Sequence, residues 1–225
     1  MKTPIAKLLK DQGITTYGFC EIPATYTTRF QGLTHAISLA VPLSDYVVDE
    51  IKDSPTVTYY QHYRTINAYI DHVTVRIGLQ LAANGYRYVA VPASQTVHEG
   101  MSYAGIFPHK TAAVLSGIGT IGKNALLITE QYGTRVRLGT ILTDMPLPTT
   151  ENVNNSACGA CNLCVTACPA RAITGEQWQA GMQREALFDA KACSEYMKAH
   201  YQHIGRGSVC GLCMRVCPKH LHKNQ

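Results

Sequence analysis

The sequence has no hydrophobic run long enough to cross a membrane. Its longest apolar stretch, residues 36–43, is interrupted by Ser38 and Pro42 and is far shorter than the roughly 20 residues of a transmembrane helix. Residues 1–13 have no apolar core of the kind found in a signal peptide. Internal repeats and low-complexity tracts are also absent. These absences argue against an integral membrane protein and favour a soluble protein of the reducing cytoplasm.

Cysteine is almost missing from the chain before Cys158, where Cys20 is the only one. Cys20 follows Phe19 and lies near Ile22, a setting typical of a small buried hydrophobic residue rather than a reactive thiol. Eight more cysteines follow in two groups, each ending with a proline. The first group is Cys158, Cys161, Cys164 and Cys168, followed by Pro169, and the second is Cys193, Cys210, Cys213 and Cys217, followed by Pro218.

The first group has the C-x2-C-x2-C-x3-C-P spacing of a bacterial ferredoxin. Zinc would use four ligands, usually in two separated pairs, and would leave the third cysteine of this run idle. Disulfides are disfavoured because cysteines three positions apart on a tight turn seldom pair and nothing indicates secretion. The pattern therefore predicts two [4Fe-4S] clusters and one-electron transfer.

The spacing also predicts which cysteines share a cluster. A tight turn can supply only three of the four thiolates, and in two-cluster ferredoxins the last cysteine of each run binds the other cluster. Cluster I is thus predicted to bind Cys158, Cys161, Cys164 and Cys217. Cluster II is predicted to bind Cys168, Cys193, Cys210 and Cys213.

The charge of the chain argues against nucleic acid as a partner. The formal net charge is +5, but each oxidised cluster with its thiolates contributes about −2, which leaves the loaded protein near roughly +1. The last third of the chain has few large aliphatic residues, so cluster binding is expected to supply much of its folding free energy.

The part of the chain before the cysteine-rich region alternates between segments typical of helices and of strands, which predicts a layered α/β (α+β) domain. Predicted helices cover residues 3–12, 56–84 and 110–115, and predicted strands cover 17–22, 35–42, 88–91 and 135–142. Residues 145–156 have the composition of a linker. We therefore predict an α/β cofactor-binding domain at 1–148 and a ferredoxin-like two-cluster domain at 149–225.

A glycine-rich segment at residues 117–124 allows three interpretations. It matches G-x-G-x-x-G, and Asp144 follows Gly122 at about the separation expected for the acidic residue of a dinucleotide site. However, the cysteine-rich region begins soon afterwards, at Cys158, which leaves little room for a Rossmann domain. Otherwise, the glycines allow close approach by a planar or anionic ligand, with Lys123 and Asn124 as donors, or they allow tight packing without a ligand.

Several blocks together resemble the epoxyqueuosine reductase and reductive dehalogenase superfamily. They are residues 109–115, the glycine-rich segment, 124–128, Tyr132-Gly133, 135–137 and 143–147, and the resemblance extends over residues 60–218. It implies a cobalamin-binding domain of nitroreductase-like fold before a two-cluster ferredoxin module, with Cys193 in the second cluster. It also implies cofactor-binding roles for His109, Lys110, Gly117, Gly119, Gly122, Lys123 and Asn124.

Two departures from the superfamily pattern matter for function. Pro92 stands where epoxyqueuosine reductases carry a proton-donating aspartate, so another acid is needed; Tyr103 is our catalytic candidate, with Tyr63 and Glu99 as alternatives. No Asp-x-His-x-x-Gly motif is present to supply a lower cobalt ligand. We therefore expect His109 to hold its loop or contact a cofactor side chain rather than bind cobalt.

The sequence supports three functional hypotheses. In the first, an external low-potential donor of ferredoxin or flavodoxin type reduces the clusters, which reduce a bound cobalamin for a reductive reaction. In the second, the protein is an electron-transfer or corrinoid-reducing partner without substrate chemistry of its own. In the third, it is a nicotinamide or flavin enzyme that uses the glycine-rich segment. A modified nucleoside, an organohalide and another protein's corrinoid all remain open as substrates.

Overall fold

A computed structural model describes residues 2–27, 29–94, 103–149, 158–205 and 209–220 of the chain. The chain divides into two compact units. Unit 1 comprises Met1–Val41, Ile66–Ile118 and Arg137–Val153, and unit 2 comprises Pro42–Thr65, Gly119–Val136 and Asn154–Gln225. The sequence predicted a single boundary near residue 148. In the structure the two units alternate along the chain, because residues 42–65 and 119–136 group with the cysteine-rich end.

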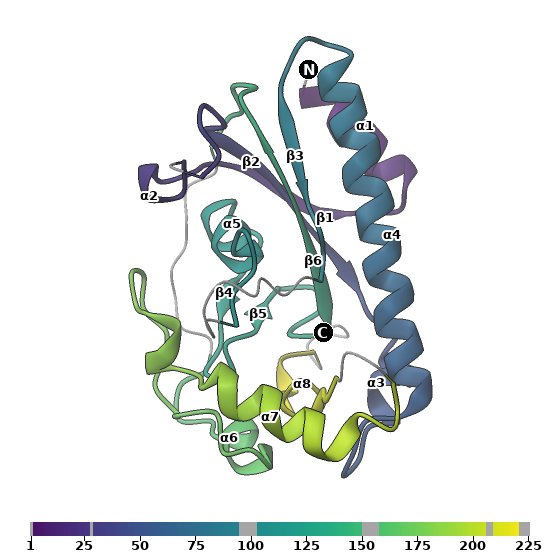
Figure 1. The fold of residues 1–225 in the computed structure, drawn as a ribbon, viewed down its shortest axis with the longest axis vertical. Helices are drawn as coiled ribbons and strands as arrows, with labels where there is room; N and C mark the ends of the chain where they lie inside the picture. The colour runs from purple at the N-terminus through teal and green to yellow at the C-terminus, as the bar shows by residue number, and fades with distance from the viewer. Residues whose placement is uncertain (1, 28, 95–102, 150–157, 206–208, 221–225) are drawn as a thin grey trace. The chain divides into compact units, whose positions relative to one another are not determined.

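Unit 1 is built on a four-stranded sheet (Figure 1). Its strand order is β1 (Thr16–Glu21), β2 (His35–Pro42), β6 (Val136–Thr143) and β3 (Tyr88–Val91). The β1/β2 and β3/β6 pairs are antiparallel. The chain is thus a mixed α/β protein with an antiparallel sheet.

The long helix α4 (Val57–Ala82) covers one face of this sheet with its C-terminal part (Figure 1). Its fully buried residues Ile70, Val73, Ile77 and Leu81 recur every three or four positions, which places them on one side of a helix. They form a single core cluster with residues of α1 (Lys2–Asp11) and of the strands. The predicted helix at 56–84 is confirmed.

Alternate strand residues face opposite sides of the sheet, as the two-residue period of a strand requires. Phe19 and Ile141 belong to the core beneath α4, whereas their neighbours Cys20 and Leu142 belong to a second core cluster. That second cluster also contains Ala112 of α5 (His109–Leu115). The sheet of unit 1 is therefore covered on both faces, which explains why six of the eight residues of β2 are buried.

The end of α4 is set by Gly85. The backbone N–H of Tyr86 donates to Leu81 and that of Gly85 to Ala82, with Gly85 at a φ of +83°. This pair of bonds satisfies the last carbonyl groups of the helix, and it requires a left-handed residue that glycine supplies without a steric cost.

Unit 2 consists of short elements. A two-stranded antiparallel hairpin joins β4 (Thr120–Ile121) to β5 (Leu127–Ile128). Unit 2 also contains the helices α3 (Asp45–Asp49), α6 (Leu163–Ala167), α7 (Ala190–Tyr201) and α8 (Leu212–Arg215), and the 3-10 turn Arg184–Ala186. The short helix α2 (Ala24–Thr27) belongs to unit 1. Asp189 caps α7 by accepting from the backbone N–H of Ala192 at 2.9 Å.

No helix in the described ranges is long and apolar enough to span a membrane. The 26-residue α4 comes nearest in length, but Arg64, Asp71 and Arg76 lie along it. This finding agrees with the shortness of the longest apolar run in the sequence.

Ile70 provides a test of the core beneath α4. It is fully buried, so Ile70→Ala should lower the free energy of unfolding by about 2–5 kcal/mol, because the truncation leaves a cavity. Val75 on the same helix is 45% exposed, and Val75→Ala should change the free energy of unfolding by less than about 0.5 kcal/mol. Urea denaturation of the two variants measures the difference, and equal effects would contradict the assigned buried face.

Candidate metal centre

The eight clustered cysteines all lie in unit 2 and are free, half-buried thiols. Each comes from a turn or a short helix, as the spacing predicts. Cys158 and Cys161 precede α6, Cys164 lies on it and Cys168 ends it, Cys193 lies on α7, Cys210 precedes α8, Cys213 lies on it and Cys217 follows it.

The thiols of the first predicted set influence one another electrostatically. Burial raises the pKa of Cys164, and the neighbouring Cys158, Cys217 and Cys161 raise it further. Burial likewise raises the pKa of Cys217, to which Cys158 and Cys161 add. Although Cys217 is distant from the first run in the sequence, it is a close neighbour of that run in space, as the crossover prediction requires.

The second predicted set shows the same behaviour. Burial raises the pKa of Cys193 to about 12, and Cys210 and Cys168 contribute to the rise. Burial also raises the pKa of Cys213 strongly, with further contributions from Cys210, Cys193 and Cys168, and a smaller one from Cys164. The structure thus brings together two groups of four cysteines, the same groups that the spacing assigns to clusters I and II. Their roles as ligands stay a prediction.

The ligands of a polynuclear cluster are spaced differently from those of a single metal ion. Among the described residues, no group of three or more His, Cys, Asp and Glu side chains is close enough to hold one metal ion. The four thiolates of a cubane cluster bind four different irons, so they lie farther apart than the ligands of one ion.

Backbone N–H groups point at the sulfur atoms of both sets. The N–H of Lys123 donates to Cys158 Sγ at 3.4 Å, and the N–H of Ala172 donates to Cys168 Sγ at 3.4 Å. Such bonds favour the thiolate over the thiol and are a known means of setting cluster potentials. These donors are what an anionic iron-thiolate cluster needs around it.

The β4–β5 turn connects the two cysteine runs. The ammonium group of the buried Lys123 donates to Asn162 Oδ1 at 2.8 Å, between Cys161 and Cys164 in sequence. The amide of Asn124 donates to the carbonyl oxygen of Cys213 at 3.1 Å. We call these two residues the hairpin clamp, because adjacent side chains contact both cluster-binding segments.

Close packing accounts for the glycines of this segment. A Cβ on Gly119 would lie 2.4 Å from the carbonyl oxygen of Ile128, and one on Gly122 would lie 2.9 Å from the Ile128 side chain. Since the segment continues into a hairpin rather than a helix, it lacks the helix N-terminus that binds a dinucleotide pyrophosphate. The local geometry therefore does not support the nicotinamide hypothesis.

Asp144 also has a different role from the one that the dinucleotide hypothesis gave it. Its carboxylate accepts from the backbone N–H of Arg87 at 2.9 Å and from the Arg87 guanidinium at 2.7 Å. Hydrogen bonding to Arg87 holds the pKa of Asp144 below its ordinary value. This pair fixes the loop that enters β3.

The predicted cofactor residues are divided between the two units. His109, Lys110 and Gly117 belong to unit 1, whereas Gly119, Gly122, Lys123 and Asn124 belong to unit 2. Gly117 has a φ of +73° and ends α5, and Lys110 is a half-buried residue of that helix. A shared role in cofactor binding stays a prediction for these residues.

The His109 imidazole uses both of its nitrogen atoms within unit 1. Nε2 lies 3.0 Å from the carbonyl oxygen of Pro92, and Nδ1 lies 2.8 Å from the hydroxyl of Thr140. Because a carbonyl can only accept, the proton of the neutral ring is on Nε2 and Nδ1 accepts from Thr140. This geometry agrees with a residue that holds its loop and leaves no lone pair for a metal.

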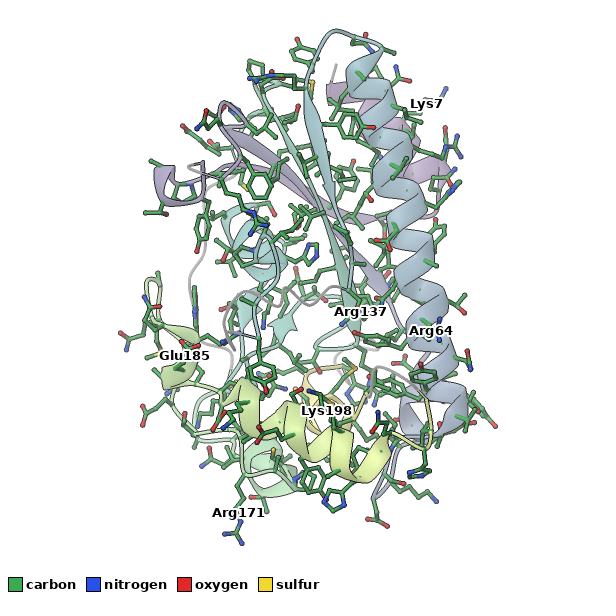
Figure 2. The ribbon with its side chains drawn as sticks, viewed as in Figure 1. Lys7, Arg64, Arg137, Arg171, Glu185 and Lys198 are labelled. Carbon is green, nitrogen blue, oxygen red and sulfur yellow. The ribbon has the colours of Figure 1, made fainter. Side chains whose placement is uncertain are left out.

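A second set of bonds fixes the loop after β3. Asp71 Oδ1 accepts from the backbone N–H of Ala93 at 2.7 Å. Arg137 Nε donates to Asn67 at 2.8 Å, and its Nη2 donates to the Ala93 carbonyl at 3.2 Å; the residue is labelled in Figure 2. Asp71, Asn67 and Arg137 were not predicted as an interacting group. The signal in the sequence was the polar residues within the long helix and the one charged residue in β6.

The candidate proton donors differ in their burial, backbone conformation and packing. Tyr103 is half-buried and has a φ of +46°, a rare backbone conformation for a tyrosine. Tyr63 lies on α4 near Tyr59, with ring centroids 6.4 Å apart, which fits a packing role. Glu99 lies outside the described residues.

Cys20 is separate from the metal centre, as predicted. It is buried in unit 1, its thiol donates to the carbonyl oxygen of Ala112 at 3.6 Å, and burial raises its pKa to about 12. A neutral thiol in this position behaves as a small apolar residue.

A buried arginine organises the region beside α8. Arg135 is 1% exposed, and its guanidinium binds Asp45 at 3.0 Å and Asp49 at 2.7 Å. Asp49 also lies 3.5 Å from Arg215 Nε on α8. These contacts connect α3, residue 135 and the second cysteine run within unit 2, and Arg135 and Arg215 together hold the pKa of Asp49 below its ordinary value.

Comparison with known families agrees with this geometry. Residues 157–220 match the family described as a 4Fe-4S double cluster binding domain. The chain is therefore a mixed α/β protein with a C-terminal double-cluster domain.

Comparison with individual proteins extends the likeness beyond the cysteines. The chain is 32% identical to an epoxyqueuosine reductase of Vibrio cholerae over 46% of this chain and 28% of the relative. It is 36% identical to one of Gloeobacter violaceus over 50% and 35%, respectively. The matching segments thus span about a third of the length of these curated relatives.

Solved structures show the same fold at lower identity. The catabolic reductive dehalogenase NpRdhA has a TM-score of 0.72 at 16% identity, over 95% of this chain and 31% of that protein. The epoxyqueuosine reductase of Streptococcus thermophilus has a TM-score of 0.61 at 19% identity, over 98% and 66%. The chain has an epoxyqueuosine reductase and reductive dehalogenase-like fold with a 4Fe-4S double-cluster domain.

His109 predicts a pH dependence of stability. Burial lowers its pKa in the folded protein, so the unfolded chain binds the proton more readily. Its contribution is present above the unfolded value of about 6.5 and is lost as the pH falls, by at most about 1.4 kcal/mol per pH unit. Urea denaturation between pH 7.5 and pH 5.5 should show a smaller loss of stability for His109→Gln than for the wild type. His72→Gln, on the exposed side of α4, should match the wild type; a slope unchanged in His109→Gln would contradict this role.

Proposed function

We propose that the protein is an iron-sulfur oxidoreductase that passes low-potential electrons through two [4Fe-4S] clusters to a bound cobalamin, for an epoxyqueuosine reductase-like reductive reaction. The observation that carries the proposal is the match of residues 157–220, which contain all eight clustered cysteines, to a 4Fe-4S double cluster binding domain. An external donor of ferredoxin or flavodoxin type would supply the electrons one at a time.

The cost of assembling the metal centre without iron supports this proposal. Burial and neighbouring thiols raise the pKa values of Cys164, Cys193, Cys210, Cys213 and Cys217. Iron must displace those protons, and its positive charge then offsets the mutual repulsion of the thiolates. With iron bound, residues arranged in this way can hold a cluster. Without iron, the proximity of their thiolates would destabilise the fold.

Cobalamin as the electron acceptor rests on the likeness to the two enzyme families. One structure of similar fold is that of a reductive dehalogenase for which a B12-dependent dehalogenation mechanism is suggested. A bound cobalamin would supply the reductive chemistry that protein side chains lack. In this chain, both nitrogens of His109 are engaged by Pro92 and Thr140, which supports a cofactor without a histidine lower ligand.

The second candidate function is an electron-transfer or corrinoid-reducing partner without substrate chemistry of its own. It is favoured by Pro92, which stands where the resemblance places a proton-donating aspartate and whose carbonyl oxygen accepts from His109. Loss of a general acid costs on the order of 100- to 10,000-fold in rate. Under the first function, Tyr103 is the residue we propose as the replacement donor.

The iron content tests the metal centre directly. Protein reconstituted anaerobically should hold about eight irons per chain, and Cys193→Ala should reduce this number toward about four, because no neighbouring cysteine replaces that ligand. Cys20→Ala is the matched control and should leave the iron content unchanged, since Cys20 lies in the core of unit 1. Wild-type protein with about four irons, or a requirement for Cys20, would overturn the assignment.

Cobalamin binding separates the two candidate functions. Calorimetry of cluster-replete protein should detect cob(II)alamin binding with a dissociation constant on the order of micromolar or tighter, and the absorption spectrum should show the base-off form. His109→Gln should keep that spectrum, because His109 is not a cobalt ligand in this proposal. Absence of binding would favour the electron-transfer partner. A Gly119→Val variant would not test cobalamin binding specifically, because the added side chain would collide with Ile128 whether or not cobalamin binds.

A further inference from the structure

Lys123 is a buried cation in the turn between β4 and β5, where it is only 6% exposed. The backbone of this turn is fixed, because the N–H of Gly122 donates to the Leu126 carbonyl oxygen at 2.9 Å and the N–H of Ala125 donates to the Gly122 carbonyl oxygen at 2.8 Å. The Asn124 side chain closes the same turn by accepting from the N–H of Leu126 at 3.2 Å. The hairpin therefore holds Lys123 in place.

The ammonium group of Lys123 has a neutral partner. It donates to Asn162 Oδ1 at 2.8 Å, and in the part of the chain that the structure describes no carboxylate forms an ion pair with it. Burying an ammonium group is costly unless a negative charge compensates it. An amide oxygen carries only a partial charge, so this bond offsets the cost only in part.

The backbone of the same residue contacts the first cysteine run. The N–H of Lys123 donates to Cys158 Sγ at 3.4 Å, and Asn162 directly follows Cys161 in that run. Both the backbone and the ammonium group therefore bond to the segment that supplies three of the predicted ligands of cluster I. A four-iron cluster with its thiolates carries a charge of about −2, which is the counter-charge that a buried ammonium group needs.

We propose that the Lys123 ammonium group is the counter-ion of cluster I, a positioning residue whose positive charge raises the reduction potential of that cluster. The proposal rests on the proposed function, because it requires both clusters to be bound. It gives a chemical role to the one charged residue of the glycine-rich segment and makes the β4–β5 hairpin a determinant of electron flow.

The physical basis is the negative charge that reduction adds. A one-electron donor such as dithionite is oxidised as cluster I gains one electron; no bond breaks, and the ammonium group keeps its proton. A fixed cation nearby stabilises the more negative, reduced cluster more than the oxidised one. This attraction is effective inside the protein, because buried charges are screened less by water and salt than exposed charges.

The test is an EPR-monitored redox titration of the cluster-replete protein and its Lys123→Met variant. Methionine keeps an unbranched, flexible side chain and removes the charge, and the backbone N–H that faces Cys158 stays in place. One of the two reduction steps should shift to a more negative potential, and the other should be unchanged. The shift should persist in roughly 1 M salt, because salt screens buried charges much less than exposed ones.

Isotope labelling identifies the step that belongs to cluster I. In wild-type protein grown with lysine that carries the heavy nitrogen isotope, the Lys123 backbone nitrogen lies beside Cys158 Sγ, so pulsed EPR should detect its coupling to the reduced cluster. That coupling should appear with the step that shifts in Lys123→Met. If the step without the coupling shifts instead, Lys123 does not act on cluster I and the proposal is wrong.

Three further variants separate charge from hydrogen bonding. Lys123→Gln keeps a donor for Asn162 but has no charge, so it should shift the same step as methionine. Lys123→Arg keeps the charge and should have potentials nearer to the wild type than either. Lys52→Met is the matched control, because it removes the same charge from an exposed residue of unit 2, and it should leave both steps unchanged.

Each other outcome overturns the proposal. Unchanged potentials in a methionine variant that holds about eight irons would refute the role of Lys123 and leave the proposed function intact. Wild-type potentials in Lys123→Gln, or a shift in Lys123→Arg as large as that in Lys123→Met, would show that the charge is not the cause. Variants that fail to hold iron would show that Lys123 builds cluster I rather than setting its potential. A wild type without clusters would refute the proposed function as well.

Discussion

The structure of unit 2 depends on offsetting the free-energy cost of bringing eight cysteine thiolates together in two groups of four. Burial and mutual proximity both disfavour the thiolate form, as the raised pKa values of Cys193 and Cys213 show. The positive charge of iron can offset that cost, because it stabilises neighbouring thiolates. The short helices of this unit fit a small module in which metal binding adds to the stability that burial supplies.

Segments far apart in the sequence hold the two cysteine runs in position. The hairpin clamp contacts both runs through Lys123 and Asn124, and Thr134 contacts the second run. Ligands of a metal are oriented by the groups that bond to them, and these groups affect the electronic properties of the metal as well. The metal centre is therefore not an independent ferredoxin appended to the chain, because residues 119–136 complete it.

Unit 1 combines a rigid sheet with a firmly held loop at residues 92–93. His109, Asp71 and Arg137 all bond to the backbone of that loop, so three elements determine its position. This loop carries Pro92, the position at which the resemblance predicts a proton donor.

The sequence alone determined α1, α4, α5 and the four strands of the sheet of unit 1, and it predicted how the cysteines are divided between two clusters. Apolar periodicity located α4 and the strands because it is a local pattern. The ferredoxin spacing predicted the two sets of cysteines through the crossover of that module, in which the last cysteine of each run binds the other cluster. Tertiary structure decided what the glycine-rich segment does: Gly119 packs against Ile128, a contact that the G-x-G-x-x-G spacing cannot distinguish from ligand approach. It also revealed Thr134 and Arg135 beside the second cysteine run, since hydrogen bonds between residues so far apart along the chain leave no periodic signal in a sequence.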